Sequence, residues 1–134
     1  MREYRWPVRV YYEDTDAGGV VYYANYLKFM ERARTEWLRD LGFEQDSLVR
    51  EQGILFAVTE VALRYLSPAR FNDALVVTSQ VVERRRASLQ FAQTVYREDQ
   101  ALCAGRIRIA CLDAVNFRPR PLPDRLIEEL VDVD

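Results

Sequence analysis

The sequence predicts an α+β fold in which one antiparallel sheet packs a single long helix against one face. Three observations support this class: a strand-like segment opens the chain, a long amphipathic helix follows, and four strand-like segments with short links come after it. Short links favour antiparallel neighbours, and strands grouped after a helix are typical of α+β proteins. The length of 134 residues suits one domain, residues 1–134.

The first strand is expected over Arg5–Tyr12. Val8, Val10 and Tyr12 alternate with more polar positions, so these three side chains should point to one face of the strand. The next segment, Glu13–Gly19, contains two aspartates, a threonine and a pair of glycines. These residue types predict a loop between the strand and the following helix.

The clearest element is a helix over Asn25–Gly42. We expect Asn25 to cap its N-terminus and Gly42 to close its C-terminus. Apolar residues recur there at steps of three and four, which is the spacing of one helix face. They are Tyr26, Phe29, Met30, Ala33, Trp37 and Leu41.

Charged side chains occupy the other positions of this helix. We expect Glu31 to pair with Arg34 and Glu36 to pair with Arg39 on the solvent-facing surface. Pairs at this spacing contribute about 0.2–0.5 kcal/mol each. These residues are therefore given no catalytic role.

The rest of the chain reads as strands with one short helix at the end. A connector, Phe43–Gly53, precedes the strands, and three prolines separate them from a predicted helix over Asp124–Val131. One helix cannot cover both faces of such a sheet, so the free face and edges predict a homo-oligomer. The four predicted strands are Ile54–Leu66, Leu75–Arg84, Ser88–Glu98 and Ala101–Asp113.

Composition excludes several classes of chemistry. The chain contains no histidine, which excludes histidine-activated nucleophiles and the zinc sites that need imidazole. We therefore expect no metal and no cofactor. Any general acid–base catalysis should depend on other side chains, such as carboxylates. The formal net charge of −2 argues against nucleic acid as a partner.

The cysteines and the N-terminus predict a cytoplasmic protein. Cys103 and Cys111 fall on one predicted strand, at a separation of about 26 Å that is too long for a bridge within one chain. Two buried free thiols suit a reducing compartment. No apolar segment resembles a signal peptide or a membrane span.

The loop before the helix carries the most informative group of side chains. Glu13, Asp14 and Asp16 lie within four residues and lead into the helix N-terminus. A calcium loop is excluded, because glycine and asparagine occupy positions that should supply ligands. Asp14 is interpreted as a turn former. Asp16 could attack a carbonyl or activate water, while free N–H groups at the helix start hold the oxyanion.

At this point the sequence resembles hotdog-fold acyl-CoA thioesterases, in the branch of 4-hydroxybenzoyl-CoA thioesterase and the YbgC-type enzymes associated with the Tol-Pal system. The resemblance covers nearly the whole chain in the right order. It rests on the stretch from Val10 to Tyr22, then Asn25-Tyr26-Leu27, Glu31-Arg32-Ala33-Arg34 and Tyr65-Leu66-Ser67-Pro68-Ala69.

The resemblance implies a hotdog fold, a five-stranded antiparallel sheet wrapped around one long helix. It implies that Asp16 is the catalytic carboxylate, as nucleophile or general base, and that the oxyanion donor is the backbone N–H at or near Tyr23. Gly19 and Val20 should contact the substrate. YbgC-type sequences usually carry histidine where this chain has Tyr23, so a role for that side chain does not transfer. The relatives' sites lie at dimer interfaces, which implies a dimer or a tetramer here.

A basic turn is the second candidate site. Arg85, Arg86 and Ser88 lie between two predicted strands. Without the resemblance, a solvated turn and a phosphate clamp are equally good interpretations, because arginine offers planar bidentate contacts to phosphate. The resemblance favours contacts to the nucleotide part of coenzyme A.

Three functions compete on this evidence. The first is an acyl-CoA thioesterase that releases a free acid and coenzyme A. A hotdog dehydratase is the second, and the missing histidine counts against it. The third is a non-catalytic module that binds acyl-CoA or acyl carrier protein.

Overall fold

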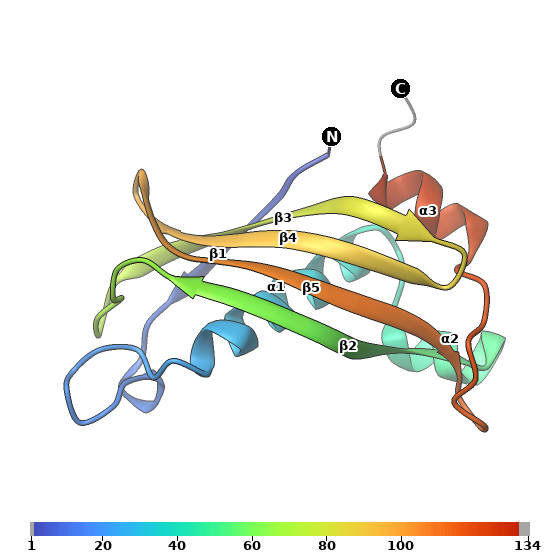
Figure 1. Cartoon of the computed structure of the whole chain (residues 1–134), viewed down its shortest axis with the longest axis horizontal. Coiled ribbons are helices and arrows are strands. Elements are labelled where there is room, and N and C mark those ends of the chain that lie inside the picture. Colours follow the sequence, from blue (N-terminus) through green and yellow to red (C-terminus); the bar gives the residue numbers. More distant parts are fainter. Residues whose placement is uncertain (1, 132–134) are drawn as a thin grey trace.

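In the computed structural model, which describes residues 2–131, five antiparallel strands form one sheet in the order β1-β3-β4-β5-β2. The long helix α1 crosses one face of this sheet, and α2 and α3 lie near one end (Figure 1). This arrangement confirms the predicted α+β class. The elements are β1 (Tyr4–Arg9), a 3₁₀ turn (Tyr12–Asp14), α1 (Asn25–Asp40), α2 (Gln45–Gln52), β2 (Ile54–Tyr65), β3 (Ala74–Arg85), β4 (Ser88–Arg97), β5 (Gln100–Asp113) and α3 (Asp124–Leu130).

Helix α1 forms because its apolar side is buried under the sheet. Phe29, Met30 and Ala33 are all 0% exposed, which is the pattern of an amphipathic helix packed on a core. Its C-terminus is closed as predicted: Gly42 adopts φ +92°, and the N–H of Phe43 donates to the Leu38 carbonyl at 2.8 Å. This left-handed glycine after the last turn is a common helix stop.

The predicted N-cap is wrong, because Asn25 is the first residue inside α1 and Ala24 is the cap. The Asn25 side chain is instead buried, and its Nδ2 donates to the backbone carbonyl of Asp14 at 3.0 Å. This contact ties the start of α1 to the preceding loop. A polar residue at a helix start can thus serve a long-range contact instead of a cap.

Two segments differ from the expectation. The first strand ends at Arg9, because the chain turns into the 3₁₀ segment and leaves Tyr12 75% exposed. The connector Phe43–Gly53 contains the helix α2, which ends at Gln52 and is followed by Gly53 with φ +67°. Among its eight residues only Leu48 is buried. The sequence therefore lacks the repeated apolar positions that would predict this helix.

The charged side of α1 is only partly as predicted. Arg39 pairs with Glu36, but Arg34 is buried and donates from Nη1 to Gln93 Oε1 at 2.8 Å. A surface pair between Glu31 and Arg34 is therefore wrong. The guanidinium reaches the sheet because Gln93 lies on β4, which α1 covers.

The two cysteines are buried free thiols on β5, as predicted. Burial raises the pKa of the Cys103 thiol to about 11, so it stays protonated at neutral pH and is a poor nucleophile. Within residues 2–131, no helix combines the length and the apolar character needed to cross a bilayer.

Candidate active site

The loop between β1 and α1 is a short hairpin with Asp16 at its turn. Thr15 and Val21 form an antiparallel bridge. The Asp16 N–H donates to the Val20 carbonyl at 2.9 Å, and the Gly19 N–H donates to the Asp16 carbonyl at 3.0 Å. Gly19 has φ +79°, a conformation that glycine adopts without steric cost. The structure thus places the candidate residues Asp16, Gly19 and Val20 in one hairpin.

Asp14 holds this hairpin against the rest of the chain. Its side chain is buried, and Oδ2 accepts the Tyr11 N–H at 2.8 Å. Its backbone carbonyl accepts both the Tyr22 N–H at 2.8 Å and the Asn25 side chain. The predicted turn-forming role fits these contacts, because the side chain accepts a backbone N–H three residues earlier and the carbonyl holds the second arm of the hairpin and the start of α1.

Asp16 differs from Asp14 in having an exposed carboxylate. One oxygen, Oδ1, accepts the Gly18 N–H at 2.8 Å, an aspartate turn of the kind that fixes short loops. Among the described residues, no hydrogen-bond donor or basic group contacts the other oxygen. A fixed side chain with one accessible carboxylate oxygen can attack an electrophile or accept a proton from water.

The start of α1 offers hydrogen-bond donors beside this loop. The Tyr22 carbonyl accepts the Asn25 N–H at 2.8 Å, and the Tyr23 carbonyl accepts the Tyr65 hydroxyl at 2.9 Å. In the part of the chain that the structure describes, the N–H groups of Tyr23 and Ala24 have no acceptor. Free N–H groups at a helix N-terminus can hold developing negative charge.

Aromatic side chains surround these donors. Tyr23 is 62% exposed, and its ring lies 4.7 Å from that of Tyr22 and 6.4 Å from that of Tyr65. Desolvation raises the pKa of Tyr65, so its hydroxyl keeps the proton that it donates to the Tyr23 carbonyl. Tyr12 stacks on Phe71, with the ring centroids 3.8 Å apart.

Sequence reasoning gave no role to Tyr65 or Phe71. Both contact residues far away along the chain, Tyr23 and Tyr12 respectively, so no local spacing could reveal them. Their side chains are 49% and 42% exposed, which separates them from core residues. This exposure follows from the tertiary structure and could not be predicted from the sequence.

The basic turn lies at the other end of the molecule. Strand β3 begins beside the hairpin, where Val20 bridges to Arg70, and ends at Arg85. Its twelve residues span about 40 Å at 3.3 Å per residue. Figure 1 shows the β1–α1 loop and the β3–β4 turn at opposite ends of the sheet. One chain therefore does not bring Arg85, Arg86 and Ser88 together with Asp16.

Comparison with known proteins gives a consistent result. The sequence profile of the thioesterase-like superfamily matches residues 10–130. The chain is similar to the acyl-CoA thioester hydrolase YbgC of Escherichia coli O157:H7, with 43% identity over 127 residues, 94% of each chain.

Solved structures agree with this likeness. A crystal structure described as a probable thioesterase from Bartonella henselae has a TM-score of 0.87 at 31% identity, and the match covers 91% of this chain and all of that one. A mutant 4-hydroxybenzoyl CoA thioesterase, in complex with 4-hydroxybenzoyl CoA, has a TM-score of 0.89 at 21% identity, over 98% of this chain and 100% of that one. At that identity the second match shows the fold alone.

Proposed function

The chain belongs to the thioesterase-like superfamily and has its hotdog fold, and we propose that this thioester hydrolase acts on an acyl-CoA and uses Asp16. The observation that carries the proposal is that the hairpin with the free Asp16 carboxylate oxygen leads directly into the N–H groups of Tyr23 and Ala24, which have no acceptor within the described residues. The name of the Escherichia coli relative, an acyl-CoA thioester hydrolase, supports the substrate class.

In this proposal the thioester carbonyl oxygen points to the Tyr23 N–H and the carbonyl carbon lies against Asp16. Two chemical routes are compatible with this arrangement. In one, Asp16 attacks the carbon, the C–S bond breaks and coenzyme A leaves as a thiolate that takes up a proton; water then hydrolyses the mixed anhydride to the free acid and the Asp16 carboxylate. In the other, Asp16 takes a proton from water, the hydroxide attacks the carbon, and the coenzyme A thiolate leaves and is protonated. Either way, the N–H groups stabilise the charge on the oxygen.

We also propose that the active form is a homo-oligomer, a dimer or a tetramer. Strand β2 is an edge of the sheet and exposes Val58, Val61 and Tyr65 by 51%, 42% and 49%, the type of apolar edge that pairs with another chain. The distance between Asp16 and the Arg85–Arg86 turn also favours a site built from two copies. Two free thiols support the predicted cytoplasmic location.

The test of the function is thiol release from a panel of acyl-CoA and acyl carrier protein thioesters. A thioesterase releases coenzyme A with multiple turnovers on at least one acyl group. The competing non-catalytic module would bind the same ligands without releasing thiol, and that result would contradict the proposal.

Tyr23→Phe is expected to keep most of the activity, within about threefold. Only the backbone N–H of this residue is used in the proposal, and its ring is 62% exposed, so the phenol contributes little to binding or folding. The measurement is kcat with the best acyl-CoA. A loss of several hundredfold in a folded variant would show that the hydroxyl itself takes part.

Replacing Arg85 and Arg86 together by alanine is expected to raise KM for acyl-CoA roughly tenfold with kcat nearly unchanged, because uniform binding is lost. Both side chains are exposed, so the fold should tolerate the change. The effect should vanish for a pantetheine thioester that lacks the nucleotide. The matched control removes two other exposed arginines, Arg5 and Arg50. Equal losses on both substrates, or in the control, would contradict the phosphate clamp.

A further inference from the structure

The β2–β3 loop, residues 66–73, holds the second arm of the hairpin that precedes α1. The Val21 N–H donates to the Ala69 carbonyl at 2.8 Å, and Val20 forms an antiparallel bridge with Arg70. Two adjacent residues of this arm are thus paired with the loop. A shift of the loop would therefore move the hairpin and its exposed carboxylate.

The same loop also contacts the start of α1 and the end of the β1 segment. Ala69 is 0% exposed and donates its N–H to the Tyr26 hydroxyl at 3.0 Å. The Val10 N–H donates to the Asp73 carbonyl at 3.0 Å, and the Val10 carbonyl accepts the Asn72 N–H at 2.9 Å. The chain that enters the hairpin, the hairpin itself and the helix that follows it are therefore all attached to one irregular loop.

Arg97, the last residue of β4, joins the two ends of this loop. Its Nη1 donates to the Pro68 carbonyl at 3.2 Å and to Asp73 Oδ2 at 2.8 Å. Its Nη2 donates to Gln100 Oε1 at 2.9 Å, and Gln100 Nε2 donates to Ser67 Oγ at 3.1 Å. Because a guanidinium is planar and directs its donors in a fixed fork, this one side chain can hold several acceptors in a defined geometry.

The ion pair between Arg97 and Asp73 persists at neutral pH. The two side chains are 26% and 24% exposed, so water and salt screen their attraction only in part. Burial acts to raise the pKa of the Asp73 carboxyl, but the Arg70 N–H and the Arg97 guanidinium outweigh it, and the net pKa is lowered. The carboxylate therefore stays charged and keeps its hydrogen bond from the Arg70 N–H, which is 2.8 Å long.

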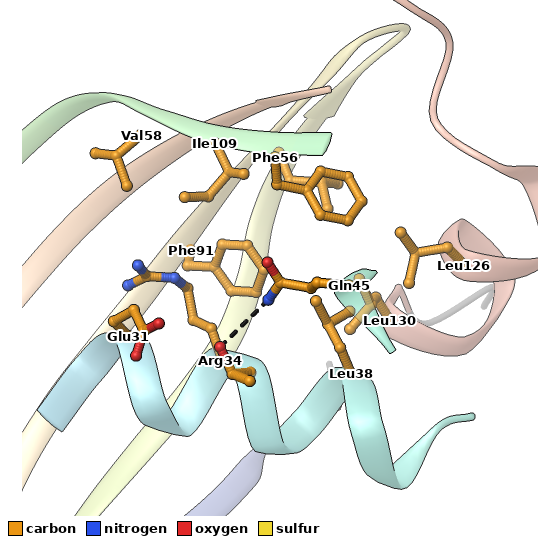
Figure 2. Close-up of a pocket in the computed structure, with 12 residues that line it drawn as sticks. Glu31, Arg34, Leu38, Gln45, Phe56, Val58, Phe91, Ile109, Leu126 and Leu130 are labelled. Carbon is orange, nitrogen blue, oxygen red and sulfur yellow. Dashed lines mark hydrogen bonds between the residues drawn. The ribbon is translucent and has the colours of Figure 1, made fainter. Parts of the chain in front are cut away.

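The buried Arg34 shows how a different arginine supports the fold without a link to the hairpin. Its guanidinium points from α1 toward the sheet, beside Phe91 (Figure 2), and donates to Gln93 Oε1 at 2.8 Å. That bond joins the middle of α1 to β4, and within residues 2–131 Arg34 makes no side-chain hydrogen bond to the β2–β3 loop. Arg97 differs because both ends of that loop depend on it.

We propose that Arg97 is a positioning residue for thioester hydrolysis: through the β2–β3 loop it fixes the hairpin that carries Asp16 relative to the N–H groups at the start of α1. This inference rests on the proposed function. Arg97 acts at a distance, since its side-chain hydrogen bonds within the described residues all end in the loop or on Gln100. A misplacement of about 1 Å can cost 10²-fold in rate, so a loosened loop should lower kcat.

The first test compares two replacements of Arg97. Arg97→Met keeps a long side chain and removes every donor, and we expect kcat to fall at least tenfold. KM for acyl-CoA should stay within threefold, because the proposed nucleotide contacts lie at the other end of the sheet. Arg97→Lys keeps a charge opposite Asp73 and should lose no more than threefold in kcat. The measurement is steady-state thiol release at a temperature at which circular dichroism shows every variant folded.

A matched control lies at the other end of β5. Arg120 makes the same kinds of contact: Nη1 donates to Asp113 Oδ2 at 2.9 Å, and Nη2 donates to the Gln52 carbonyl at 3.3 Å. Arg120→Met therefore removes an equivalent ion pair far from the hairpin of its own chain and should leave kcat within twofold. An equal fall of kcat in Arg97→Met and Arg120→Met would indicate a general loss of stability and would overturn the proposal. An unchanged kcat in folded Arg97→Met would overturn it too.

Amide hydrogen exchange tests the positioning without any activity. In Arg97→Met, exchange over residues 17–23 should be at least tenfold faster, because the Val21 N–H leaves the Ala69 carbonyl more often; exchange over residues 103–111 should not change. Unchanged exchange in the hairpin would overturn the proposal even in an active enzyme. A wild type that releases no thiol would contradict the proposed function instead, and exchange would still decide whether Arg97 holds the hairpin.

Asp73→Asn replaces Arg97→Met if that variant does not fold. The amide keeps an oxygen for the Arg70 N–H and removes the charge that faces Arg97. We expect kcat to fall about threefold and exchange in the hairpin to become faster. No change in either quantity would overturn the proposal.

Discussion

Asp16→Asn is expected to reduce kcat by at least ~10², the scale of a lost general base, with the fold and the oligomeric state unchanged. An amide keeps the volume of the side chain, and its oxygen can still accept the Gly18 N–H that fixes the turn. It can neither attack a thioester efficiently nor remove a proton from water. The measurement is steady-state thiol release from the best acyl-CoA, with circular dichroism as the check on folding.

The same loop offers two matched controls. Glu13→Gln removes a charge from an exposed side chain and should leave kcat within about twofold. Asp14→Asn should cost much less than Asp16→Asn, because among residues 2–131 the Asp14 carboxylate accepts only the Tyr11 N–H, which an amide oxygen can also accept. If Asp16→Asn hydrolyses acyl-CoA as fast as the parent, the proposed active site is wrong and the likeness to thioesterases concerns the fold and not this loop.

Single turnover in ¹⁸O-labelled water separates the two chemical routes. A nucleophilic Asp16 places its own unlabelled oxygen in the first acid product, because water then attacks the carboxylate carbon of the enzyme. A general base instead delivers the label directly to the product. Attack of water on the acyl carbon of a mixed anhydride would mimic the second outcome, so trapping that anhydride with hydroxylamine completes the assignment.

The helix α1 and the four long strands could be predicted because their apolar spacing is a local property. β3 extends one residue beyond the predicted bounds at each end, and β2, β4 and β5 each differ from the prediction by one residue at one end. Asp16 could also be found, since an aspartate between a strand and a helix stands out against a chain without histidine. Local patterns thus located the framework and a candidate catalytic carboxylate, whose role stays a prediction.

The remaining features depend on contacts between distant segments. Helical spacing placed Arg34 beside Glu31, but it could not show that Gln93, on β4, supplies a buried acceptor for the guanidinium. The hydrogen bond from the Tyr65 hydroxyl to the Tyr23 carbonyl could not be predicted for the same reason. The separation of Asp16 from Arg85 follows from the direction of β3, which no motif encodes.

Gln93→Leu is expected to destabilise the protein by about 3 kcal/mol, because breaking a buried polar network around a charge typically costs 3–5 kcal/mol. Leucine fills nearly the same volume, so no cavity is created. The variant removes the only hydrogen bond that Arg34 makes to protein within the described residues, the bond to Gln93 Oε1. It also removes the Gln93 Nε2 donor from the Ser79 hydroxyl, which is 0% exposed. For a domain of this size the thermal midpoint should fall by roughly 10 °C.

The matched control is Gln80→Leu on β3, whose side chain is only partly buried and points away from the network; it should change stability by less than about 0.5 kcal/mol. The double variant Gln93→Leu with Arg34→Met tests the cause. It should recover most of the loss, because replacing both partners of a buried polar pair by apolar groups removes the unmet desolvation cost. Midpoints are compared at one protein concentration, since assembly shifts them. A single variant that loses less than 1 kcal/mol, or a double variant less stable than Gln93→Leu, would show that the charge of Arg34 does not depend on Gln93.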